Sequence, residues 1–102
     1  MTSRYILAPE AAQDLVDIWA YVKAQAGEST ADRIEAVIRS RLVLLADNPN
    51  LGHWRSDLTH EHVKFFLVFS YLIVYRPETK PLQVVSILHG RRDVEKILQG
   101  RP

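Results

Sequence analysis

The sequence predicts an α+β protein in which an antiparallel α-hairpin packs on a mainly antiparallel sheet of three to four strands. Apolar residues in the first half recur with helical spacing, whereas the second half has short runs of β-branched and aromatic residues. The chain has 102 residues, 47% of them hydrophobic, and no cysteine. We therefore expect a single domain over residues 1–102 that is held by its own core without disulfides.

The first half predicts a short strand at Arg4–Leu7 and then two helices. Pro9 suits the first turn of a helix, where its missing N–H costs no hydrogen bond. The stripe of the first helix, over Glu10–Ala26, is Ala11, Leu15, Ile18, Val22 and Ala26. Gly27 predicts its end, and Ser29 with Asp32 predicts a weak capping box for the next helix. The apolar stripe of this second helix is Ile34, Val37, Ile38, Leu42 and Leu45.

The second half predicts strands at Val63–Val68, Tyr71–Arg76 and Leu82–His89, with a brief one at 53–55. Phe69-Ser70 is expected to form a tight turn, and Asp93 to cap a short C-terminal helix at Val94–Gln99. Consecutive strands on short loops favour antiparallel pairing. The helical hairpin is therefore expected to cover one face of the sheet.

Charge is divided unevenly along the chain, although the net charge is only +1. Residues 1–62 carry six basic and nine acidic residues, a net of −3, while residues 63–102 carry seven basic and three acidic residues, a net of +4. The two halves can therefore face different partners. The longest apolar stretch, 65–75, is too short to span a membrane, so we expect a cytoplasmic protein with no membrane partner.

Cationic and imidazole side chains occur at the predicted strand ends: Lys64, Arg76 and His89, followed by Arg91 and Arg92. If these ends converge, they suit phosphate chemistry, because arginine and lysine hold phosphate oxygens and histidine transfers a proton near neutral pH. Lys64, Arg76 and His89 would then be the catalytic residues of a ribonuclease. The alternative is that the two cations are solvated strand ends and that the histidine bonds to backbone in a turn.

Other motifs are weaker. His53, His60 and His62, with Glu61 nearby, match no strong zinc spacing, so no metal site is expected. The chain has no Walker loop, dinucleotide glycine pattern or Gly-x-Ser-x-Gly elbow. We expect no cofactor.

Several stretches share their order and spacing with one known family. They are Leu7-Ala8-Pro9-Glu10-Ala11, Asp14-Leu15, Ile18-Trp19-Ala20-Tyr21, Leu45–Gly52 with Arg55 and Asp57-Leu58 after it, Tyr71–Pro77 and Ile87–Asp93. In this combination the chain resembles the ParE branch of the RelE/ParE toxin superfamily. The sequence departs from the family pattern at Lys64, where arginine is common, and at Phe69-Ser70, which replaces a glycine-containing turn.

The resemblance implies the toxin of a type II toxin–antitoxin pair. A ParD-like antitoxin of the ribbon-helix-helix type would neutralise it, and operator DNA would be bound only through that antitoxin. An antitoxin helix is expected in a groove between the hairpin and the sheet, lined by Leu15, Ile18, Trp19, Val22, Ile34 and Ile38.

The resemblance leaves two targets open. ParE-type toxins act on DNA gyrase, whereas RelE-type relatives cut mRNA in the ribosome. The ending His89-Gly90-Arg91-Arg92-Asp93 is ParE-like, and a net charge of +1 is low for a protein that enters the ribosome. We therefore favour a non-enzymatic gyrase inhibitor, with Lys64, Arg76, His89, Arg91 and Arg92 facing the target. A RelE-like mRNA endonuclease is the alternative.

Overall fold

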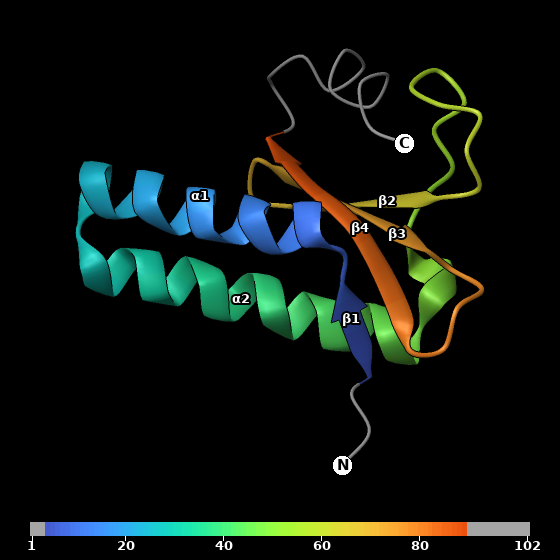
Figure 1. Ribbon diagram of the computed structural model, residues 1–102, viewed down its shortest axis with the longest axis horizontal. Coiled ribbons are helices and arrows are strands. Elements are labelled where there is room, and N and C mark those ends of the chain that lie inside the picture. Colours follow the sequence, from blue (N-terminus) through green and yellow to red (C-terminus); the bar gives the residue numbers. More distant parts are fainter. Residues whose placement is uncertain (1–3, 90–102) are drawn as a thin grey trace.

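The computed structural model describes residues 4–89 and confirms the α+β class (Figure 1). Its elements are β1 (Tyr5–Leu7), α1 (Pro9–Ala26), α2 (Glu28–Asp47), the short 3-10 helix η1 (Pro49–Leu51), β2 (Lys64–Val68), β3 (Tyr71–Arg76) and β4 (Leu82–His89). The two helices lie side by side and cover one face of the sheet. The predicted C-terminal helix, Val94–Gln99, lies outside the described residues.

The two helices are joined by one residue. Gly27 ends α1 and precedes α2, and its φ of 94° is one that glycine adopts without steric cost. The predicted capping box at Ser29 is therefore wrong, because α2 begins at Glu28 and its N-cap makes no side-chain hydrogen bond. Asp32 is used elsewhere: its Oδ1 accepts a hydrogen bond from Trp19 Nε1 at 2.8 Å, which ties the two helices together.

Within residues 4–89 the sheet has four strands in the order β1-β4-β3-β2, so β1 pairs with β4, the last strand of this range. β1 is parallel to β4, while β2–β3 and β3–β4 are antiparallel. β1 pairs with only three residues of β4. Further along β4, the Ile87 N–H donates a hydrogen bond of 2.9 Å to Asp14 Oδ2 on α1. The brief strand expected at 53–55 is a single bridge between His53 and Phe65.

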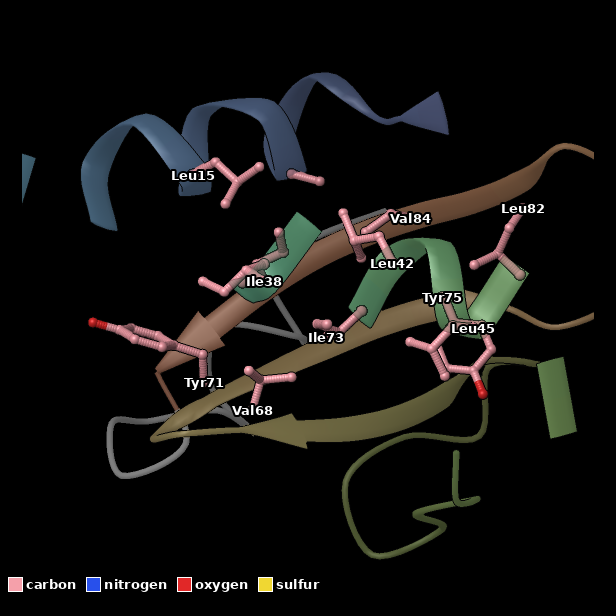
Figure 2. Packing of buried hydrophobic residues seen from close by; sticks show 12 residues of the cluster. Leu15, Ile38, Leu42, Leu45, Val68, Tyr71, Ile73, Tyr75, Leu82 and Val84 are labelled. Carbon is pink, nitrogen blue, oxygen red and sulfur yellow. The ribbon is translucent and has the colours of Figure 1, made fainter. Parts of the chain in front are cut away.

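Both faces of the sheet are covered. On the face toward the hairpin, Tyr71, Ile73 and Tyr75 of β3 pack with residues of α1 and α2, as Figure 2 shows. On the opposite face, Leu72 and Val74 belong to a second cluster. Because side chains alternate along a strand, this two-sided burial fixes which β3 residues face which layer.

Tyr75 anchors the turn that follows α2. Its ring is fully buried, and its hydroxyl donates a hydrogen bond to the Pro49 carbonyl at 2.7 Å and accepts one from Gly52 N–H at 2.9 Å. A Cβ at Gly52 would lie within van der Waals overlap of that hydroxyl. The close approach of Tyr75 therefore requires glycine at position 52.

We predict that Tyr75→Phe lowers the free energy of unfolding by about 1–3 kcal/mol, because it leaves the Pro49 carbonyl and Gly52 N–H without their partner. Denaturant unfolding measures the effect. Tyr21→Phe, at an exposed tyrosine of α1, is the matched control and should change stability little. Equal stability of the two variants would contradict the prediction.

The same residue predicts a pH dependence. Burial raises the pKa of Tyr75 above its ordinary value of 10.0, and the hydrogen bond from Gly52 opposes this only in part. A raised folded-state pKa gives stability that is complete below about pH 10 and is lost as pH rises through the folded value. Unfolding free energies measured from about pH 8 to about pH 11 should therefore fall more steeply for the wild type than for Tyr75→Phe. Parallel curves would refute it.

Candidate functional site

Lys64 opens β2 but is not a solvated strand end. Its side chain is largely buried, with 8% of the residue exposed. Nζ lies 3.4 Å from the Asn50 carbonyl, to which it donates, and 5.0 Å from the centre of the Trp54 ring. The ammonium group is thus held between a backbone oxygen and an aromatic face, where cation–π attraction is strengthened by partial desolvation.

Arg76 lies at the same end of the sheet as Lys64 but belongs to the other face. The register pairs Lys64 with Tyr75, whose side chain faces the hairpin. Arg76 is the next residue, so alternation along the strand directs its side chain to the opposite face. The two cations therefore share a sheet end without sharing a surface.

His89 ends β4 at the other end of the sheet. It pairs with Tyr71, the first residue of β3, and the two rings meet edge to face with centroids 5.6 Å apart. Tyr71 and Arg76 are five residues apart on β3, which corresponds to about 17 Å at about 3.4 Å per residue. β4 pairs with β3, but His89 does not converge with Lys64 and Arg76, so the condition for a shared phosphate site is not met.

The sheet topology keeps His89 away from the other two side chains. β4 runs antiparallel to β3, so the end of β4 lies beside the start of β3 and away from the end that carries Arg76. A ribonuclease site built from Lys64, Arg76 and His89 is not assembled. Arg91 and Arg92 lie outside the described residues.

The polar side chains of the loop before β2 make local contacts. The His62 ring lies against the Trp54 ring in a tilted arrangement, with centroids 4.8 Å apart, and its Nε2 lies 2.8 Å from Glu78 Oε1. Arg55 binds Asp57 through two hydrogen bonds of 2.9 and 2.8 Å, and the hydrogen bonding to Arg55 lowers the pKa of that carboxyl. Within residues 4–89, no three His, Asp or Glu side chains gather as metal ligands.

The residues expected to line an antitoxin groove fall into two groups. Leu15, Val22 and Ile38 are buried inside the molecule, where Leu15 and Ile38 belong to the core between hairpin and sheet (Figure 2). Ile18, Trp19 and Ile34 are half-buried. Only this second group offers apolar surface that a partner can reach.

Sequence reasoning missed the exposed apolar residues at the other side of the sheet. Leu67 of β2 is 63% exposed, and Phe69 of the β2–β3 turn is 55% exposed. Both line an open cleft of about 460 Å³. Phe69 also has a φ of 55°, a left-handed conformation that is strained for an aromatic residue. The departure from a glycine-containing turn at Phe69-Ser70 was the signal for this surface.

Neither helix in the described part of the chain is long and apolar enough to cross a bilayer. No buried side-chain nitrogen or oxygen in residues 4–89 lacks a hydrogen-bond partner.

Known proteins are similar to this chain in sequence and in fold. Residues 5–94 match the family model described as "ParE toxin of type II toxin-antitoxin system, parDE". Toxin ParE1 from two strains of Mycobacterium tuberculosis, CDC 1551 / Oshkosh and H37Rv, is 28% identical over 99 residues, which cover 96% of this chain and all of the relative.

A solved structure described as the chromosomal ParDE TA system from P. aeruginosa has a similar fold, with a TM-score of 0.72 at 20% identity. The match covers 85% of this chain and 98% of that chain. The fold agrees with the family model, which spans most of the sequence. The chain belongs to the ParE toxin family of type II toxin–antitoxin systems.

Proposed function

We propose that this toxin is neutralised by a ParD-like antitoxin of the ribbon-helix-helix type and, when free, inhibits DNA gyrase in the cytoplasm. Operator DNA would be contacted only through the antitoxin. The observation that carries a binding role is the separation of Lys64, Arg76 and His89 across two faces and two ends of the sheet. General acid–base cleavage of RNA needs such groups within hydrogen-bond reach of one phosphodiester.

The half-buried hairpin residues support a site for the antitoxin. Ile18 on α1 and Ile34 on α2 pack against the core without being enclosed by it. The turn end of the hairpin extends past the strands in Figure 1, so its inner side is not covered by the sheet there. An amphipathic helix that places apolar residues against this side would complete the core and remove the remaining apolar surface from water.

We expect Ile34→Asp to weaken binding of the cognate antitoxin by about tenfold or more, because a carboxylate at the centre of an apolar contact is desolvated without a partner. Titration calorimetry on the purified pair measures the dissociation constant. Val16→Asp is the matched control, since Val16 is an apolar residue of α1 that is 59% exposed. Similar losses for both variants, or none for Ile34→Asp, would exclude this surface.

The low net charge supports gyrase over the ribosome as the target. The net charge of +1 provides little long-range attraction to ribosomal RNA. At the sheet ends Arg76 and His89 are half-buried, whereas Lys64 is largely buried and held by Asn50 and Trp54. Within the described residues, Arg76 and His89 are therefore the better candidates to face the target.

Purified toxin should inhibit supercoiling of relaxed plasmid by gyrase, and added antitoxin should restore it. Arg76→Ala and His89→Ala are measured separately, because the two residues lie at opposite ends of the sheet. The variant at the end that faces gyrase should raise the half-inhibitory concentration by about tenfold, the loss expected for one interface contact. Arg41→Ala, an exposed arginine of α2, is the control and should leave inhibition unchanged. Full supercoiling at saturating toxin would reject gyrase as the target.

A further inference from the structure

The surface of α2 is divided between two opposite sides. One side faces α1 and β1: Asp32 accepts the hydrogen bond from Trp19 on α1, and Arg39 Nη1 donates one to the Tyr5 hydroxyl of β1 at 3.3 Å. At about 100° per residue, the Arg41 side chain leaves the helix about 160° away from that of Arg39. Arg41 therefore belongs to the side of α2 that is turned away from α1 and β1.

That second side carries apolar residues between and beside two arginines. Val37 lies four residues after Arg33 and four residues before Arg41, so the three side chains are neighbours on the helix surface. Ile34 precedes Val37 by three residues, and Leu44 follows Arg41 by three, which extends the same side in both directions. These five residues are called the α2 row.

The α2 row lies at the border of the core and is only partly covered. Ile34 and Val37 pack against the core and are half-buried, whereas Leu44 is 39% exposed and both arginines are exposed. Ile38, the residue after Val37, points into the core, as Figure 2 shows. The row therefore leaves apolar surface in water along about 15 Å of the helix.

The row is also basic, although the first half of the chain is acidic as a whole. Within residues 4–89, neither Arg33 nor Arg41 forms an ion pair. Two acidic residues of the same helix are instead ion-paired with other arginines, namely Glu35 with Arg39 and Asp47 with Arg4. The two arginines of the row are thus left to attract a negatively charged partner.

We infer that the α2 row receives an acidic amphipathic helix of the antitoxin, with apolar side chains against the row and carboxylates at Arg33 and Arg41. The two arginines are eight residues apart, about 12 Å along the axis, so the two carboxylates lie about two helical turns apart. Paired hydrogen bonds between guanidinium and carboxylate groups then fix the register of the bound helix. This inference rests on the proposed antitoxin site and specifies which helices that site accepts.

Charge favours this occupant over a second copy of the chain. In a two-fold contact centred on Val37, the Arg33 of each copy would meet the Arg41 of the other, and like charges repel. A nucleic acid would satisfy the arginines, but its phosphate backbone offers no apolar surface to Val37 and Leu44. An acidic helix with one apolar side satisfies both parts of the row.

Titration calorimetry of the full chain with its purified, full-length cognate antitoxin tests the inference. We expect Arg33→Glu with Arg41→Glu to raise the dissociation constant by about tenfold or more at about 0.1 M salt, because two attractions become repulsions. Raising the salt to about 0.5 M should narrow the difference from the wild type. Arg33→Gln with Arg41→Gln removes the charges without reversing them and should give a smaller loss in the same direction.

Arg4→Glu with Lys80→Glu is the matched control, since both are exposed cations outside α2 and the net charge changes by the same amount. Its affinity should stay within about twofold of the wild type, because charges far from a contact are screened. Thermal unfolding shows whether each variant remains folded.

Two results would overturn the inference alone: unchanged affinity of the α2 variants, or equal losses in the α2 variants and the control. A third is a loss of affinity for a short DNA duplex with antitoxin binding unchanged, because the row would then contact nucleic acid. A wild-type toxin that does not bind the antitoxin at all would instead reject the proposed function together with the inference.

Discussion

The burial of β3 on both faces is the constraint on which the rest of this structure depends. Five of its six residues are buried, and they alternate between the hairpin side and the opposite cluster. A slip of one residue would exchange the two sets and place side chains fitted to one layer in the other. The register of β2 and β4 against β3 is therefore strongly specified, and so are the positions of the strand ends.

That register decides what the polar residues can do together. Lys64 faces the layer of Tyr75, Arg76 faces the other layer, and His89 lies beside Tyr71 at the far end. Lys64 is further engaged by Asn50 and the Trp54 ring. The three side chains act at separate places, which agrees better with surface recognition than with a concentrated catalytic site.

The hydrophobic layers also determine where partners can bind. The core between hairpin and sheet takes up Leu15 and Ile38, while Ile18 and Ile34 stay half-buried at its border. On the other face, the cluster around Leu72 and Leu88 opens toward Leu67 at the sheet edge. Each hydrophobic layer thus ends in apolar residues that are only partly covered. Large exposed apolar patches are characteristic of binding surfaces.

The sequence by itself determined both helices, the bounds of β3 and β4 and the Phe69-Ser70 turn, because these depend on local periodicity and turn residues. The motif set also identified the family. Only the tertiary structure decided that β1 pairs with β4, that Asp32 binds Trp19, and which candidate residues are buried. These features join residues far apart in the chain, and their free energies depend on packing that no local pattern encodes.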